Sequence, residues 1–94
     1  MIALIATLKA KPGKGAELEK AALALVAKVR SDEPGNALYV LCRGDAPDTY
    51  VMLERYHDMA AIDAHRASPH YKEAGKAMAD FLDGRPEVTK LTEI

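Results

Sequence analysis

Apolar and polar residues follow one another along this chain in patterns that predict four strands and several helical segments. Met1–Lys9 is apolar on both of its alternating sets of positions, which is typical of a central strand covered on both faces. Residues 37–43 and 49–56 are rich in aliphatic residues and tyrosine, and the turn residues 44–48 between them indicate a β-hairpin. Residues 87–94 alternate less regularly and predict a last strand that is either bulged or at a sheet edge.

The helical segments are recognised by apolar residues that recur every three or four positions. Ala16–Arg30 has such a stripe, and Glu33-Pro34-Gly35 ends it because proline cannot continue a helix. A second helical region is predicted in two pieces. Asp58 caps a short helix that runs to about His65, and Ser68-Pro69 starts a new helix with serine as N-cap and proline in the first turn.

This order of elements defines the fold class. Strand, helix, strand, strand, helix pair and strand form the split βαβ arrangement, a ferredoxin-like βαββαβ sandwich of the α+β class. The first and third strands are central in that topology, and they are the most apolar here. Residues 1–94 are predicted to form a single domain. Because the helices suffice for only one face of the sheet, a second copy of the chain is expected to cover the other face as a homodimer.

Charge and composition exclude several classes of partner. The net charge is −1, with 13 basic and 14 acidic residues spread along the chain, so no basic field exists for nucleic acid. No stretch approaches the roughly 18 to 20 apolar residues that a membrane span needs, and the N-terminus lacks the features of a secretory leader. The single cysteine, Cys42, forms no internal disulfide. We therefore expect a cytoplasmic protein without membrane or nucleic-acid partners.

The candidate chemistry lies between residues 57 and 70, which contain all three histidines, His57, His65 and His70. Imidazole is the side chain that titrates near neutral pH unperturbed. On one continuous helix, His65 and His70 would lie about 140° apart, so they would not share a face as metal-binding pairs do. No phosphate loop and no Cys/His set with zinc or iron–sulfur spacing is present, so neither a metal nor another cofactor is predicted. The structural alternative is that these are surface histidines at helix ends.

Several short motifs, in order, resemble a known family. They are Pro12-Gly13 before the first helix, Glu33-Pro34-Gly35 after it, Glu54-x-Tyr56 on the third strand, and Ala64-His65-x-x-Ser68-Pro69-His70-Tyr71. This pattern resembles the antibiotic biosynthesis monooxygenase (ABM) domain family, dimeric α+β barrels that include cofactor-independent quinol and polyketide monooxygenases. The resemblance implies the fold, the dimer and a pocket between sheet and helices. Most family members have tryptophan where this chain has Tyr56.

Haem-degrading members of that family share the fold and differ from this chain in their motifs. They carry an asparagine on the first strand, a tryptophan in the short helix and a histidine iron ligand on the long helix. This chain has no asparagine on its first strand and no tryptophan anywhere, and its expected ligand position falls near Gly75. Haem cleavage is therefore disfavoured.

Oxygenation without a cofactor sets clear chemical requirements. The substrate must be electron-rich, such as a hydroquinone or an anthrone-like phenol, and the site needs a base, a donor for the oxyanion and an apolar chamber. The resemblance favours His65 as the base, with a small aromatic or quinone-like molecule and O₂ as partners. Glu54 and Tyr56 alternate onto one strand face, so Glu54 could orient an imidazole, and Tyr56 and Tyr71 are candidate donors. The predicted substrate-binding residues are Glu54, Tyr56, His70, Tyr71, Met78 and Phe81.

Structural alternatives stay open for these residues. Glu54 could belong to an ion pair with Arg55, His70 could be a helix-start or dimer contact, and His57 is expected to be solvated. The helical spacing of Tyr71, Met78 and Phe81 is typical of core residues first and of pocket lining second.

Two other functions also fit the sequence. The run His65-x-x-x-Pro69-His70-Tyr71 resembles the autoinducer-processing members of the family, which indicates an isomerase or another proton-transfer enzyme. A non-enzymatic stress protein that binds a small apolar ligand is the third reading.

Overall fold

A computed structural model describes residues 1–94 and has the ferredoxin-like α+β fold that the sequence predicts. The elements are β1 (Ile2–Lys9), α1 (Gly15–Asp32), β2 (Asn36–Arg43), β3 (Thr49–Tyr56), α2 (Met59–Ala67), α3 (Pro69–Ala79) and β4 (Glu87–Thr92). They match the predicted segments with small shifts at the ends. None of the helices has both the length and the apolar composition that crossing a membrane requires.

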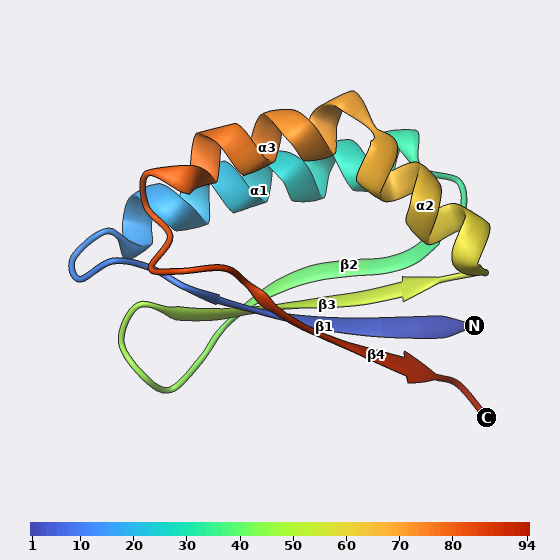
Figure 1. Ribbon diagram of the computed structural model, residues 1–94, viewed down its shortest axis with the longest axis horizontal. Coiled ribbons are helices and arrows are strands. Elements are labelled where there is room, and N and C mark those ends of the chain that lie inside the picture. The colour runs from blue at the N-terminus through green and yellow to red at the C-terminus, as the bar shows by residue number, and fades with distance from the viewer.

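The four strands form one antiparallel sheet in the order β2-β3-β1-β4. The prediction that β1 and β3 are central is confirmed. The prediction that β1 is covered on both faces is not met within one chain, because the helices cover one face only and just its alternate residues are fully buried (Figure 1). β4 pairs only with β1, so the edge position is confirmed. The irregularity predicted for this strand is instead in β2, between Asn36 and Leu38. Every residue of β4 is exposed, so burial imposes no strict alternation on it.

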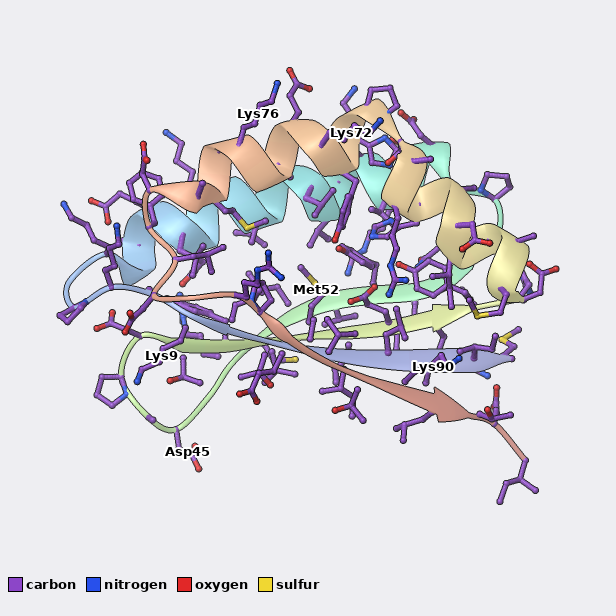
Figure 2. The ribbon with its side chains drawn as sticks, viewed as in Figure 1. Lys9, Asp45, Met52, Lys72, Lys76 and Lys90 are labelled. Atoms are coloured by element: carbon purple, nitrogen blue, oxygen red, sulfur yellow. The ribbon has the colours of Figure 1, made fainter.

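All three helices lie on one side of the sheet, and no helix covers the other side (Figure 1). Met52 of β3 lies between the sheet and the helices, whereas Lys72 and Lys76 point outward from α3 (Figure 2). The main core lies between α1 and the sheet and includes Leu18 and Val29, both fully buried. This layered arrangement leaves an interior space under α2 and α3.

The break between α2 and α3 is set by local caps, as predicted. The Asp58 carboxylate accepts a hydrogen bond from the amide of Ala61 at 2.9 Å. The Ser68 hydroxyl donates to the carbonyl of His65 at 2.6 Å and accepts from the amide of Tyr71 at 3.2 Å. Ser68 therefore ends one helix and begins the next, so that His65 and His70 belong to two separate helices.

Candidate active site

A cavity of about 350 Å³ lies between the sheet and the α2–α3 pair. This volume falls within the range of about 300–1,000 Å³ that is usual for small-ligand pockets. Its wall is mostly apolar and includes Leu4, Met52, Met78 and Leu82. The polar and charged side chains in the wall are Tyr39, Glu54, His65, Arg66, Tyr71 and Arg85.

His65 is the most enclosed imidazole of the chain, with only 2% of the residue exposed. Its ring lies between three tyrosine rings, with centroid distances of 5.4 Å to Tyr39, 5.5 Å to Tyr56 and 4.8 Å to Tyr71. Such aromatic surroundings restrict the ring to one orientation. The interpretation of His65 as a surface histidine is therefore wrong, because His65 lies on the buried face of α2 together with Ile62, three residues earlier.

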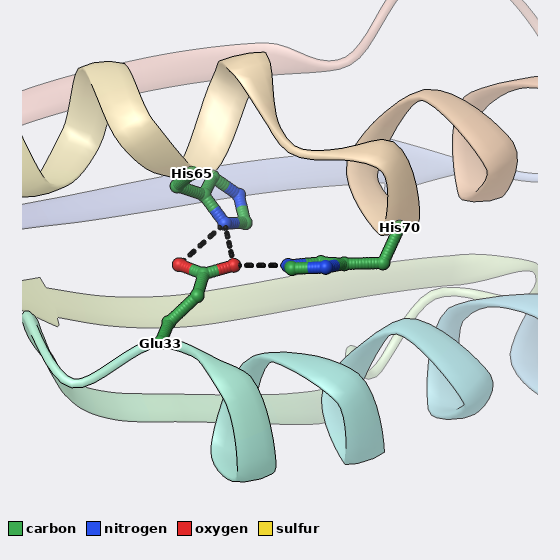
Figure 3. Close-up of side chains that lie close together, drawn as sticks. All are labelled: Glu33, His65 and His70. Atoms are coloured by element: carbon green, nitrogen blue, oxygen red, sulfur yellow. Dashed lines mark hydrogen bonds and ion pairs between the residues drawn. The ribbon is translucent and has the colours of Figure 1, made fainter.

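The orientation of His65 is fixed by Glu33. The Nδ1 atom of His65 lies 3.0 Å and 2.8 Å from the two carboxylate oxygens of Glu33 (Figure 3). The Nε2 atom has no hydrogen-bond partner. Every fully buried side-chain nitrogen or oxygen atom of the molecule has a hydrogen-bond partner. Since Nε2 has none, it is not fully buried and retains access to open space. Because His65 lines the cavity, we place Nε2 at the cavity wall.

Glu33 is the residue that sequence reasoning missed. It was assigned only to the end of the first helix, and the structure places it at the C-cap of α1, with 10% of its side chain exposed. One local signal was available, because an acidic residue at a helix C-terminus opposes the helix dipole. A residue that breaks a local rule in this way commonly serves a tertiary or functional purpose.

His70 also contacts Glu33, so the two histidines meet at one carboxylate although they do not share a helical face. His70 Nε2 lies 2.5 Å from Glu33 Oε2, the same oxygen that lies 2.8 Å from His65 Nδ1. They reach it from two helices, because the predicted break at Ser68 lies between them. The donor atoms of Glu33, His65 and His70 all lie within 4.8 Å of one another, so a set of metal-ligating groups does exist.

The pKa of His65 follows from two opposing effects. Burial lowers the pKa below its ordinary value, and the nearby Glu33 carboxylate acts in the opposite direction with a smaller effect. His65 is therefore neutral at neutral pH, with its proton on Nδ1 facing Glu33. The Nε2 lone pair is then available toward the cavity.

Glu54 is a second buried carboxylate in the cavity wall, with 6% of the residue exposed. Burial raises its pKa to about 7, although the hydroxyl of Tyr56, which donates to Glu54 Oε1 at 2.7 Å, acts against that rise. The prediction that Glu54 and Tyr56 share a strand face is confirmed. Arg55 pairs with Glu93 at 2.7 Å, so the proposed ion pair with Glu54 is not formed. Glu33, and not Glu54, contacts the imidazoles.

The other predicted residues divide between the cavity and its surroundings. Tyr71 and Met78 line the cavity. Tyr56 is completely buried and reaches the cavity only through its hydrogen bond to Glu54. Phe81 packs against the main core, and His70 lines a separate groove between α1 and α3.

Tyr39, Arg66 and Arg85 line the cavity without having been predicted to do so. Tyr39 is directly opposite Glu54 in the β2–β3 pairing, so the strand register could have indicated its position. Burial raises the pKa of Tyr39, and its hydroxyl stays protonated at neutral pH. Arg66 and Arg85 follow no periodic pattern that distinguishes them from surface residues.

Fold and site together define a class: a ferredoxin-like α+β protein with an apolar, ligand-sized cavity and a buried neutral histidine in its wall. Residues 1–77 match the model of the family described as "Antibiotic biosynthesis monooxygenase", and the chain belongs to this family. The matched range contains Glu33, Glu54, His65 and His70. The cavity wall contributed by residues 82–88 lies beyond it.

Individual relatives agree with this assignment. The chain is 40% identical over 73 residues to "Putative monooxygenase YcnE" of Bacillus subtilis, covering 77% of this chain and 76% of that protein. It is 28% identical to "Putative monooxygenase Rv0793" of Mycobacterium tuberculosis, and the match covers 99% of this chain and 91% of that protein. A crystal structure of an antibiotic biosynthesis monooxygenase from Caulobacter crescentus, called putative in its description, superposes with a TM-score of 0.94 at 39% identity, covering 99% and 89%. Family and names support a monooxygenase-like function at the family level.

Proposed function

We propose that this protein is a cofactor-independent monooxygenase that oxygenates a small phenolic, quinol or polyketide-like substrate, with His65 as the general base. One observation carries the proposal. A neutral imidazole stands in the wall of an apolar cavity, with Nδ1 held at 2.8 Å from Glu33 and with Nε2 free of any partner. A carboxylate that holds an imidazole in one tautomer is the arrangement by which enzymes prepare histidine as a base.

The reaction begins with proton removal. His65 Nε2 takes the acidic proton of the substrate, and the resulting electron-rich anion reacts with O₂ directly. For an anthrone-like substrate, a CH₂ group and O₂ give a carbonyl group and water, so no external reductant is needed. Tyr39 and Tyr71 are both in the cavity wall, and we assign to their hydroxyl groups the role of hydrogen-bond donors to the substrate oxyanion.

The apolar wall supports this chemistry in two ways. Leu4, Met52 and Met78 favour an aromatic substrate by removing apolar surface from water. They also lower the local dielectric constant, which strengthens the hydrogen bonds that the tyrosines offer to a developing negative charge.

The test is oxygen uptake by the purified protein with a panel of hydroquinones and anthrone-like phenols. We expect saturable O₂ consumption that persists after dialysis against a chelator. A matched anaerobic assay follows exchange of the substrate proton with deuterium from solvent. If compounds of the panel bind in the cavity but cause neither O₂ consumption nor deuterium exchange, the enzyme assignment is overturned and the protein is a small-ligand-binding protein.

The second candidate function is an isomerase or another proton-transfer enzyme, and Glu54 is the observation that favours it. Its pKa is raised to about 7, and it shares the cavity wall with His65. Two groups that exchange protons near neutral pH can serve as acid and base in one turnover. Deuterium exchange into a keto–enol substrate without O₂ uptake would favour this function over oxygenation.

We also propose that the protein acts as a homodimer joined through the sheet face that lacks helices. Val40 and Leu53 are opposite each other on that face, and Leu91 lies on the same face of β4. Leu53 is 36% exposed and Leu91 is 46% exposed, which is unusual for large apolar residues in a small sheet. Light scattering at micromolar concentration should give the mass of two chains. A stable monomer would overturn this proposal.

A further inference from the structure

We propose that Glu33, His65 and His70 form a binding site for a divalent transition-metal ion of the zinc type. Three segments supply the donors: the C-cap of α1, which is distant in the sequence, and the adjacent last turn of α2 and first turn of α3 (Figure 3). Glu33 Oε2 lies 2.8 Å from His65 Nδ1 and 2.5 Å from His70 Nε2. All three donor groups converge within 4.8 Å.

The chemistry of the donors selects the class of ion. Two imidazole nitrogens and one carboxylate suit Zn²⁺ and its first-row neighbours, whereas Mg²⁺ and Ca²⁺ prefer oxygen ligands alone. Three protein ligands also leave the fourth tetrahedral position of Zn²⁺ to water. We therefore choose Zn²⁺ as the probe and Mg²⁺ as the ion that should not bind.

The geometry requires only a small adjustment. With bonds of about 2.0–2.2 Å to Zn²⁺, tetrahedral donors lie roughly 3.3 Å apart. The two imidazole nitrogens are 2.5 Å and 2.8 Å from the shared oxygen, so an ion would move each of them away from it by less than about 1 Å. The nitrogens lie within 4.8 Å of each other and would approach by up to about 1.5 Å. His70 makes none of the ring contacts that hold His65, so we expect His70 and the Glu33 carboxylate to supply most of this movement.

Burial and access also fit a metal site. The side chains of His65, Glu33 and His70 are 3%, 10% and 14% exposed. Enclosure of this kind limits competition by water for the donors. The groove of about 340 Å³ between α1 and α3, which His70 lines, is an entry path that does not pass through the cavity. The site therefore lies between the groove and the cavity, with His65 as the side chain that reaches the cavity.

Metal binding would change the chemistry of His65, and this step rests on the proposed function. A metal bound to Nδ1 uses the lone pair of that nitrogen, so the proton of the neutral imidazole moves to Nε2. Nε2 then faces the cavity as an N–H donor and cannot accept a proton from substrate. Zn²⁺ bound at this site should therefore inhibit turnover.

The primary test is calorimetric titration of the purified protein with Zn²⁺ in metal-free buffer, with no substrate present. We expect saturable binding of one ion per chain and no binding of Mg²⁺. Glu33→Gln and His70→Gln should each weaken Zn²⁺ affinity by at least roughly 10- to 100-fold. His57→Gln removes an exposed imidazole outside the cluster and should leave the affinity unchanged.

Folding is monitored separately, so that a misfolded variant does not mimic a lost site. Bound Zn²⁺ should raise the melting temperature of the unmodified protein in a concentration-dependent way. With Co²⁺ in place of Zn²⁺, the visible spectrum should show the intense d–d bands of a tetrahedral site. Absence of saturable Zn²⁺ binding to the unmodified protein, or equal affinity in the Glu33→Gln and His57→Gln variants, would overturn the proposal.

Failure of this proposal is distinguishable from failure of the proposed function. If Zn²⁺ fails to bind and His65→Gln still abolishes turnover, the metal-site proposal is contradicted and the assignment of His65 as base is supported. If Zn²⁺ binds with the predicted dependence on Glu33 while turnover on a verified substrate continues at saturation, the site stands and the role of His65 as base falls.

Discussion

Glu33 and Glu54 are two buried carboxylates near the same cavity, and they differ in their partners. Glu33 contacts the imidazoles of His65 and His70, which come from two other helices. Glu54 accepts one hydrogen bond from the hydroxyl of Tyr56, two residues further along its own strand. A neutral hydroxyl offsets only part of the desolvation of a carboxylate, and the pKa of Glu54 is accordingly raised to about 7.

This difference separates two roles. Glu33 positions another group, because its oxygens are committed to imidazole nitrogens. Glu54 exchanges a proton itself near neutral pH. The role of a buried carboxylate therefore depends on its hydrogen-bond partner and not on burial alone. The following experiments test this separation, from the largest expected effect to the smallest.

His65→Gln should produce the largest effect, a decrease in turnover of about 10²- to 10⁴-fold, because it removes the proposed base, whose imidazole Glu33 contacts. Glutamine is preferred to alanine since His65 is 2% exposed and a truncated side chain would leave a cavity. The measurement is kcat on a verified substrate together with a circular dichroism spectrum. His57→Gln is the matched control and should retain full turnover. Equal turnover in the two variants would make His65 a structural residue.

The second prediction concerns the stability contributed by Glu54 as a function of pH. Its pKa is raised from 4.5 to about 7, so between these pH values the folded state binds more protons than the unfolded state. The free energy of unfolding of the unmodified protein, relative to Glu54→Gln, should therefore fall as pH rises from about 4.5 to about 7, by up to about 3 kcal/mol.

Urea unfolding at a series of pH values measures this difference. The contribution of His65 is common to both proteins and cancels in the comparison. A difference that stays constant across this pH range would contradict the raised pKa of Glu54.

Tyr56→Phe should have a moderate effect. It keeps the buried ring and removes the only hydrogen bond to Glu54, so above neutral pH it should destabilise the fold by about 1–3 kcal/mol. The pKa of Glu54 should rise further, because the hydroxyl of Tyr56 lowers it at present. Denaturant unfolding and infrared spectroscopy of the protonated carboxyl group measure the two effects. Tyr50→Phe is the control, because it removes a hydroxyl that donates to Glu19 near the surface. If Tyr50→Phe lowered the free energy of unfolding as much as Tyr56→Phe, the burial of Glu54 would be unimportant for the effect.

Arg43→Gln should have the smallest effect. It breaks the pair between Arg43 and Glu19, whose carboxylate oxygens lie 3.1 Å and 2.7 Å from two guanidinium nitrogens. The Arg43 side chain is 76% exposed, and such ion pairs contribute little because water solvates the separated charges well. The melting temperature should stay unchanged within error, and so should turnover. A clear fall in melting temperature would indicate that this contact is important for holding β2 against α1.

The features that were predicted correctly depend on residues close together in the chain. Alternation along β3 places Glu54 and Tyr56 on one face, because side chains of a strand repeat every two residues. The caps at Asp58 and Ser68 are contacts within three residues. The central position of β1 and β3 followed from the order of the elements along the chain, which is that of the split βαβ arrangement, and the apolar composition of these strands agreed with it.

Only the tertiary structure decided how the site is assembled. Glu33 is separated from His65 by 32 residues and from His70 by 37, and no periodicity relates positions so distant. Packing of α1 beside α3 and the break at Ser68 bring the three side chains to one point. The sequence by itself therefore determined the elements and their order, because these depend on local periodicity and capping, and the family resemblance supplied His65 as the candidate base. The partner of that base was decided by how the helices pack on the sheet.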